Sequence, residues 1–582
     1  MGTATQPETP AGERPRVWSR RRFLTLIGAT AAVSASGILA ACGGGSDDAA
    51  ETTPTAVSGE QPGGAATPGG SDGEGVQGGT LTYVTNEEPD TLNPYLTQLV
   101  VGFDILSLFM ESLLEADDTG QYGPRLAEAY EAAPDGLSYT FKLRTGVKWH
   151  DGSDFTAQDV IESYNMIMNP DFGAFNQQGW EQITGSETPD DHTVVFTLDR
   201  VFAPFIANVG GSYIAPASAL TKGIQSFKEE FGRQPYGTGP YTFVEWVSGD
   251  HVTAKANPDY WQGPPKLEQI VCRFVPNSNT IAVQLRSGEA DLAAYVEAQQ
   301  YDTFVAMEDK RVIETDSQAW YHLDLKNIDF LMEKPVRQAL DFATPKQEII
   351  DKILKGHATI SVADIAPISW AYNPNIEPRP YDLEQAKKLL DEAGWTPGPD
   401  GIRQKDGKRM QLELWGIAGD QQGQQILQVI AASWKQIGVQ ADLKFQDIRT
   451  LWGPEGYQFT ETPTACGFSW FNGNDPDNTF YWHSSQIPDS PTGSGGNLPA
   501  YFNPYDMQEQ IDELTERGVS TIDQEERKRI YWEIQELLHE HVPVIFIYWN
   551  KLIFVCPKNL QGFNPNAFTP LFYNVHEWAY SA

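Results

Sequence analysis

Cysteine, basic residues and long apolar runs are all scarce in this sequence. Four Cys among 582 residues are too few for a disulfide scaffold or for a cysteine-built zinc or iron–sulfur site. Lys and Arg number 41 against 78 Asp and Glu, and the resulting net charge of −37 repels phosphate backbones, which argues against nucleic-acid binding. After residue 79 no long uncharged apolar run occurs, so the chain is not expected to span a bilayer.

The composition that is present belongs to a folded, acidic protein with several lobes. A 12% aromatic and 40% hydrophobic content argues against general disorder. At roughly 150 residues per domain, the length predicts three or four domain-sized units.

The first 42 residues have the pattern of an export signal. A basic stretch containing Arg20 and Arg21 precedes the uncharged run 23–41, and small residues follow. The segment around Arg20 and Arg21 resembles the twin-arginine motif, and the residues before Cys42 resemble a bacterial lipobox, in which Cys42 would be acylated. The alternative is an uncleaved membrane anchor, for which a run so rich in Ala, Ser, Gly and Thr is only marginally apolar. Residues 43–78 contain neither aromatic nor basic residues, which predicts a flexible tether.

The remaining chain mixes strand and helix patterns, which predicts an α/β fold with antiparallel additions in its first half. Strands are predicted at 79–84, 137–143, 194–198, 241–247, 270–275, 410–415 and 542–549. Helices are predicted over 101–114, after Thr156, after Asp382, over 426–437 and after Asp523.

No catalytic pattern is convincing in this sequence. The Gly-x-Ser-x-Gly match at 69–73 lies in the tether, without the strand and helix that such a nucleophile needs. His539 and His541 would point to different sides of a helix, so they do not easily share one metal ion. Asp475 and Asp477 form an acid pair that leaves an exported hydrolase as a weak alternative. Cys272 and Cys556 fit either a disulfide or two free buried thiols.

Aromatic residues beside amides are a stronger indication of a ligand site. Trp370, Trp415, Trp470 and Trp482 are expected in or beside loops, although many Trp residues belong to cores. The segment 470–478 places two large rings beside three amides and two acids, a mixture that suits a wet binding pocket.

A series of segments, in order along 79–582, resembles the dipeptide/oligopeptide-binding family of solute-binding proteins from ATP-binding-cassette (ABC) importers, the family 5 extracellular solute-binding proteins. The segments with the most specific resemblance are 124–128, 137–144, 146–152, 237–241, 257–261, 288–291, 336–340 and 475–478.

The resemblance implies a periplasmic-binding-protein type II-like α/β fold with two main lobes and an inserted third lobe. Lobe I would comprise 79–123, 235–319 and 548–582. Lobe II, the insertion, would be 124–234, and lobe III would be 320–547. The main lobes would close over a solute around crossing segments near 319–322 and 546–549.

The resemblance also implies a receptor that performs no chemistry and needs no cofactor or metal. It would work as an extracytoplasmic, lipid-anchored monomer and deliver a small peptide or other polar solute to a permease with its ATPase. The expected ligand-binding residues are Trp470, Asn472, Asp475, Trp415, Glu87, Glu88, Thr91 and Trp370.

The identity of the solute stays open between two classes. In peptide-binding relatives an Asp pairs with the ligand's α-ammonium group, and the alignment places Asn472 at that position, with Asp475 nearby. An amide lacks the charge that an ammonium group prefers. Oligosaccharides or other polar solutes therefore remain an alternative to peptides.

Overall fold

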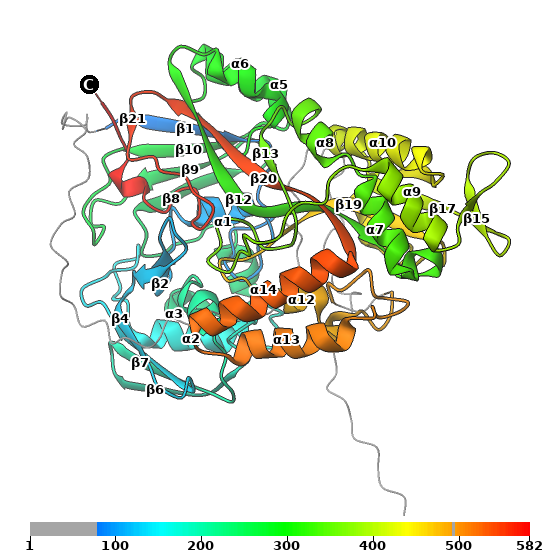
Figure 1. Cartoon of the computed structure of the whole chain (residues 1–582). Helices are drawn as coiled ribbons and strands as arrows, with labels where there is room; N and C mark the ends of the chain where they lie inside the picture. Colours follow the sequence, from blue (N-terminus) through cyan, green and yellow to red (C-terminus); the bar gives the residue numbers. More distant parts are fainter. Residues whose placement is uncertain (1–77, 492–494, 582) are drawn as a thin grey trace, which may run out of the picture.

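The computed structural model describes residues 78–491 and 495–581. The expected export signal with Arg20, Arg21 and Cys42, and the tether up to residue 77, lie outside these ranges. Figure 1 shows two long strands crossing the centre of the molecule, with the amino-terminal strands on one side and helices of the second half on the other. None of the helices in the described ranges combines the length and apolar character needed to cross a membrane.

An 11-stranded mixed sheet runs through the whole molecule. In spatial order its strands are β18 (Gln440–Gln446), β17 (Gln411–Ile417), β19 (Thr464–Phe471), β12 (Lys310–Leu325), β20 (Val544–Pro557), β11 (Leu292–Ala293), β1 (Thr80–Thr85), β10 (Gln269–Phe274), β9 (His251–Ala256) and β8 (Tyr241–Val247), with β13 (Ala358–Ile360) also on β20. β1 is parallel to β10 and β11, and β17 is parallel to β18 and β19, whereas the other pairs are antiparallel.

The antiparallel pair β12–β20 joins the two parts of this sheet. Its register runs from Lys310 opposite Pro557 to Asp324 opposite Val544, with irregularities between Asp316 and Trp320 and at Tyr321. β19 attaches along the second half of β12, while β11 attaches to β20 opposite the first half. The two strands therefore connect the groups of strands on either side of the molecule (Figure 1).

A separate four-stranded antiparallel sheet forms from residues 127–198. Its spatial order is β4 (Ala127–Ala132), β5 (Ser138–Leu143), β7 (Thr193–Leu198) and β6 (Ile183–Asp190). The strands predicted at 137–143 and 194–198 are confirmed as β5 and β7. The helix predicted between them is confirmed as α2 (Ala157–Ile167), which begins with a capping box of Thr156 and Asp159.

The remaining strands form small ribbons. They are β2 (Leu114–Ala116) with β3 (Tyr122–Pro124), β14 (Thr396–Pro397) with β15 (Arg403–Lys405) and β16 (Lys408–Arg409), and β21 (Leu560–Gln561) with β22 (Ala579–Tyr580).

Helices cover the sheets, and most longer ones lie in the second half of the chain. They are α1 (Val100–Leu106), α2, α3 (Ala217–Leu220), α4 (Ile224–Ser226), α5 (Ser278–Ser287), α6 (Tyr301–Val305), α7 (Lys334–Phe342), α8 (Lys346–Lys352), α9 (Leu383–Glu392), α10 (Gln421–Gln436), α11 (Ile448–Trp452), α12 (Thr479–Trp482), α13 (Gln508–Ser520) and α14 (Gln524–His541). The predicted starts of α9 and α14 are confirmed, because Asp382 and Asp523 accept backbone hydrogen bonds from their first turns.

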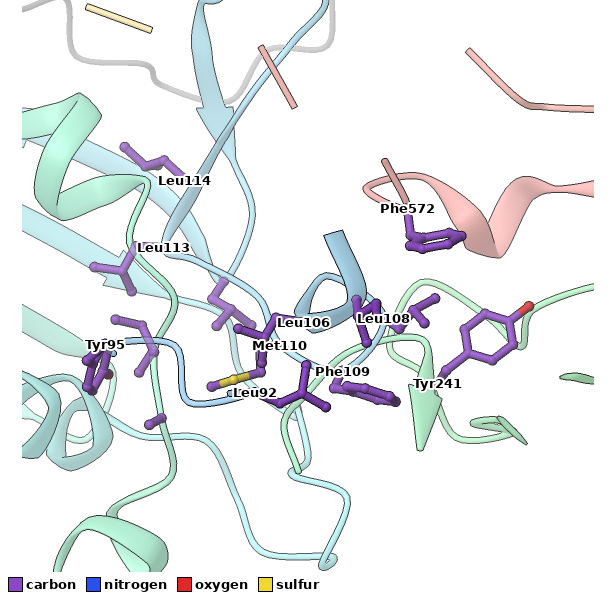
Figure 2. Packing of buried hydrophobic residues seen from close by; sticks show 14 of the residues in the cluster. Leu92, Tyr95, Leu106, Leu108, Phe109, Met110, Leu113, Leu114, Tyr241 and Phe572 are labelled. Carbon is purple, nitrogen blue, oxygen red and sulfur yellow. The ribbon is translucent and has the colours of Figure 1, made fainter. Parts of the chain in front are cut away.

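The helix predicted over 101–114 is too long, because α1 ends at Leu106. The backbone beyond it pairs with a distant segment: Gly239 N donates to Phe109 O at 2.9 Å, and Tyr241 N donates to Leu108 O at 2.9 Å. These tertiary hydrogen bonds replace helical ones. Figure 2 shows the buried cluster that results, in which Leu106, Leu108 and Phe109 lie near Tyr241 and Phe572.

The three described cysteines are free and buried. Cys272 lies in β10 and Cys556 in β20, with β11 and β1 between these strands. Three strand spacings amount to about 14 Å, which is too far for a disulfide. Of the two alternatives, the structure therefore favours free thiols.

Asp104 is a buried carboxyl that fastens the carboxyl-terminal segment to α1. Its Oδ1 accepts a hydrogen bond from Leu571 N at 2.8 Å, and its Oδ2 accepts one from Tyr295 Oη at 3.0 Å. Burial raises the pKa of Asp104 to about 7. The folded state therefore favours the protonated form. The stabilisation is complete below the unfolded pKa of about 4 and is lost as the pH rises towards 7.

We expect the variant Asp104→Asn to lose less stability than the wild type between pH 5 and pH 7. In the wild type, ionisation of this carboxyl in the unfolded state should lower the free energy of unfolding by roughly 1 kcal/mol per pH unit over this interval. The amide of the variant does not ionise, so the variant lacks this contribution. Urea unfolding at pH 5, 6 and 7 measures the difference. Asp171→Asn is the matched control, because Asp171 is exposed and should keep the wild-type slope. A slope in Asp104→Asn equal to that of the wild type would contradict the expectation.

Candidate functional site

A cavity of about 530 Å³ lies where four segments of the chain meet and form three walls. One wall comes from residues 94–125, a second from 167–213, and a third from 471–481 together with 568–573. This volume is within the range of about 300–1,000 Å³ that is usual for small-molecule sites.

The third wall begins where β19 leaves the sheet. β19 is buried from Thr464 to Trp470 and ends at the exposed Phe471. The following loop is held by local hydrogen bonds. Asp477 N donates to Asp475 Oδ1 at 3.2 Å, and Thr479 N donates to Asp477 Oδ1 at 2.8 Å as α12 begins. These turns present the loop to the cavity in a fixed shape.

Asn474 connects this loop to the first wall and to the carboxyl-terminal segment of its own wall. Its Nδ2 donates to Tyr122 Oη at 3.1 Å and to Phe568 O at 2.8 Å. Tyr122 lies in β3, and Phe568 belongs to the carboxyl-terminal segment, so one amide joins three distant parts of the chain around the cavity.

Two carboxylates share one guanidinium on the first wall. Arg125 Nε donates to Glu111 Oε1 at 2.7 Å, and Arg125 Nη1 donates to Glu115 Oε2 at 3.0 Å. Glu111 also accepts hydrogen bonds from Thr238, Tyr260 and Trp261. Glu111 is therefore saturated with donors, while Glu115, whose side chain is 26% exposed, faces the cavity more openly.

A second such group lies on the third wall. Arg527 Nη2 is 3.2 Å from Asp475 Oδ1, and Asp477 lies two residues further along the loop. Burial raises the pKa of Asp475 to about 7, although Arg527 acts in the opposite direction. Burial likewise raises the pKa of Glu115 to about 7 against the effect of Arg125. Both carboxyls are thus poised to titrate near neutrality.

Aromatic rings make up much of the remaining wall. The rings that line the cavity are those of Tyr95, Phe103, Tyr122, Phe175, Trp180, Tyr213, Phe471, Phe480, Tyr481, Phe568 and Tyr573. Rings of this kind cover apolar parts of a ligand, and their faces also attract cations.

Two of the residues expected to bind ligand, Asn472 and Asp475, line this cavity. The Asn472 side chain is already engaged inside the protein: its Oδ1 accepts from Trp320 Nε1 at 2.8 Å, and its Nδ2 donates to Asp364 O at 3.0 Å. Asn472 therefore shapes the wall from within, whereas Asp475 keeps 11% of its side chain exposed. Whether either residue binds ligand stays a prediction.

Two tryptophans expected to bind ligand from positions in or beside loops lie near the ends of strands and are buried. Trp470 lies in β19 and Trp415 in β17, with only 7% and 4% of their surfaces exposed. Both strands have a neighbouring strand on each side, and both rings belong to one buried hydrophobic cluster. Trp470 lies one layer behind the cavity, since its ring centroid is 5.1 Å from that of Tyr481, which lines it.

The other expected residues are not among those that line the cavity. Glu88 accepts hydrogen bonds from Trp246 Nε1 at 2.9 Å and Gly249 N at 3.0 Å, and Thr91 Oγ1 accepts one from Asn93 N at 3.1 Å. Glu87 is exposed on the same loop. The Trp370 ring lies 5.3 Å from the guanidinium of Arg527, behind Asp475.

Sequence reasoning missed Glu115, Tyr122 and Arg125 as cavity residues. Arg125 belongs to one of the segments that resemble the solute-binding family, but nothing local marks it as facing a ligand. Glu115 is one of 78 acids and carries no pattern of its own. Among the described residues, no group of three or more His, Cys, Asp or Glu side chains is arranged to hold a metal.

The family of this chain follows from comparison with known proteins. The model of the bacterial extracellular solute-binding proteins, family 5 (middle region), matches residues 121–490, more than half of the chain. The chain belongs to this family, and its fold is that of the type II periplasmic binding proteins.

The chain is similar over most of its length to proteins with named solutes. It is 28% identical over 521 residues to the oligopeptide-binding protein AppA of Bacillus subtilis, covering 87% of this chain and 93% of AppA. It is 29% identical over 477 residues to the glutathione-binding protein GsiB of Salmonella typhimurium, covering 81% and 89%.

Solved structures show the same similarity. AppA from Bacillus subtilis in complex with a nonapeptide has a TM-score of 0.74 at 27% identity, covering 88% of this chain and all of AppA (100%). DppA from Helicobacter pylori in complex with the peptide STSA has a TM-score of 0.72 at 25% identity, covering 87% and 99%.

We expect Asn474→Ala to loosen the walls of the cavity. The change removes the hydrogen bonds to Tyr122 and Phe568 and the one that Asn474 Oδ1 accepts from Gln318 Nε2, each of about 1 kcal/mol, between separate parts of the chain. Solution scattering of the ligand-free variant should give a larger radius of gyration than that of the wild type. Asn559→Ala, at an exposed asparagine, is the control and should match the wild type. An unchanged radius of gyration in Asn474→Ala would mean that other contacts hold the walls together.

Proposed function

We propose that this chain is the extracytoplasmic receptor of an ABC importer and that it captures a small peptide in the cavity described above. The observation that carries the proposal is the cavity itself, with its mixture of rings, amides and carboxylates, in a chain of a solute-binding family. The similarity to AppA, which is named for oligopeptides, supports a peptide as the solute.

In this proposal the solute is enclosed by movement of lobes. Lobe I (79–123, 235–319 and 548–582) and lobe III (320–547) would move relative to each other about β12 and β20, with lobe II (124–234) carried on lobe I. The origin of the lining residues supports this mechanism, because they come from the ranges of all three proposed lobes. A solute that contacts all the walls binds the closed form better and shifts the balance towards it.

The receptor would be held outside the cytoplasm by a lipid on Cys42, after export directed by a signal containing Arg20 and Arg21. As a monomer it would pass the solute to a permease whose ATPase drives transport. The solute would leave chemically unchanged, since the proposed role requires only binding and release.

An oligosaccharide is a second candidate for the solute. The ring-rich wall favours it, because sugar faces stack on aromatic side chains. The carboxylates on two walls favour the peptide, because its ammonium group pairs with them through charge-assisted hydrogen bonds.

We expect saturable changes in tryptophan fluorescence when the full chain is titrated with short peptides. Trp180 lines the cavity and Trp470 lies just behind it, so a bound solute alters the surroundings of both rings. Native mass spectrometry of the same samples should show a one-to-one complex with an intact peptide. Saturation by oligosaccharides and by no peptide would overturn the choice of solute, and a shortened bound peptide would overturn the non-enzymatic role.

A further inference from the structure

We infer that the cavity selects solutes with two positive groups, one placed at Glu115 and the other at Asp475. The inference rests on the proposed function and adds the charge class of the solute. Suitable solutes are dipeptides with basic side chains or small aliphatic diamines.

The first group of charges has one more carboxylate than cation. Glu111 and Glu115 share Arg125, whose Nη2 also donates to Tyr260 Oη at 2.9 Å. Because Glu111 is saturated by its donors, the excess negative charge is available at Glu115. Its Oε2 is held by Arg125, and within the described residues its Oε1 has no hydrogen-bond partner.

The second group lies on the third wall. Asp475 has Arg527 as its cationic partner, Asp477 follows two residues further along the loop, and Arg527 does not line the cavity. Asp475 Oδ1 accepts from Arg527 Nη2 and from Asp477 N, while Oδ2 has no partner among the described residues. Asp477 Oδ1 accepts from Thr479 N and Oγ1, so its charge is directed towards the start of α12.

The two groups share one arrangement: an arginine binds one oxygen of a carboxylate, and the other oxygen has no partner among the described residues. Among the described residues that line the cavity, Arg125 is the single basic side chain, against four carboxylates. An anionic solute would meet repulsion on both walls, whereas a singly charged cation would leave one carboxylate without a partner. Two cationic groups neutralise both excess charges, and the aromatic rings around them stabilise cations further.

Isothermal titration of the full chain with four probes tests the selection. The probes are the dipeptides Lys-Lys, Ala-Ala and Glu-Ala, and 1,4-diaminobutane. We expect Lys-Lys to bind at least tenfold more tightly than Ala-Ala, and Glu-Ala to bind most weakly. Tight binding of 1,4-diaminobutane would identify two amines as sufficient, and binding of Lys-Lys alone would add a requirement for the peptide backbone or for the third ammonium group that Lys-Lys carries.

Two variants locate the selection. Glu115→Gln and Asp475→Asn should each weaken Lys-Lys binding by about 10- to 100-fold, as expected for loss of a charge-assisted hydrogen bond, with a smaller effect on Ala-Ala. Both substitutions keep the shape of the side chain and an oxygen for the neighbouring arginine. Glu128→Gln, at an exposed position on β4, is the control and should bind like the wild type. Thermal melts of each variant check that it is folded.

The outcomes separate this inference from the proposed function. Equal binding of Ala-Ala and Lys-Lys by the wild type, or an unchanged preference in both variants, would overturn the inference and leave a peptide receptor. Failure of all four probes, with saturable binding of an oligosaccharide, would overturn both.

A pH series adds a readout that a purely structural role would not produce. The groups facing Glu115 are Arg125, Glu111, Tyr213, Tyr260 and Tyr573, and those facing Asp475 are Arg527, Asp477 and Tyr122. Each of the two carboxyls has a pKa raised to about 7 by burial, so lowering the pH from 8 to 6 protonates it.

We expect the affinity for 1,4-diaminobutane to fall on acidification by about tenfold for each carboxyl, because both amines of this probe stay protonated throughout. In Glu115→Gln and in Asp475→Asn only one of the two carboxyls remains, so the affinity of each variant should fall by about tenfold in total on the same acidification. An affinity that is constant between pH 8 and pH 6 would contradict the assignment of the two carboxylates.

Discussion

The antiparallel pairing of β12 with β20 is the interaction on which the rest of the structure depends. These strands lie between the two groups of strands in one sheet, so the sheet is continuous across the molecule only through their pairing. Between Asp316 and Trp320 the pairing is irregular, which leaves the ladder fully regular only towards its two ends. A connection of this kind holds two bodies together while it permits a change of angle between them.

The charges of the cavity also depend on burial. In water an exposed pair of carboxylates would differ little from any other acids of this chain. In the protein, Glu115 and Asp475 are each held beside one arginine, and burial disfavours the charged form of each carboxyl in the absence of a further cation. In the proposed selection, a solute must place a positive group at each of these two carboxylates. Specificity of this type comes from the penalty on unmatched solutes as much as from attraction to the matched one.

The local features of this fold could be predicted from the sequence, whereas its long-range pairings could not. The caps at Thr156, Asp382 and Asp523 act within a few residues, and each starts the helix that it predicts. The predicted helix over 101–114 was too long because its second half pairs with residues near 239–241, which no local pattern reveals.

The same distinction holds for the cavity. The loop after β19 could be placed near a ligand because rings, amides and acids are adjacent in sequence, and Asn472 and Asp475 do line the cavity. Glu115 and Arg125 reach it through a small β-ribbon and through contacts with Tyr260, far along the chain, so no sequence signal marks them. Trp470 is the opposite case: its sequence context suggested contact with a ligand, but the ring is buried in the core against the sheet.

The order of synthesis has a further consequence for this sheet. β20 leaves the ribosome among the last segments, so β12 and β11 of the nascent chain have unpaired edges until β20 is made. Until then, the growing chain needs protection from strand pairing with other chains.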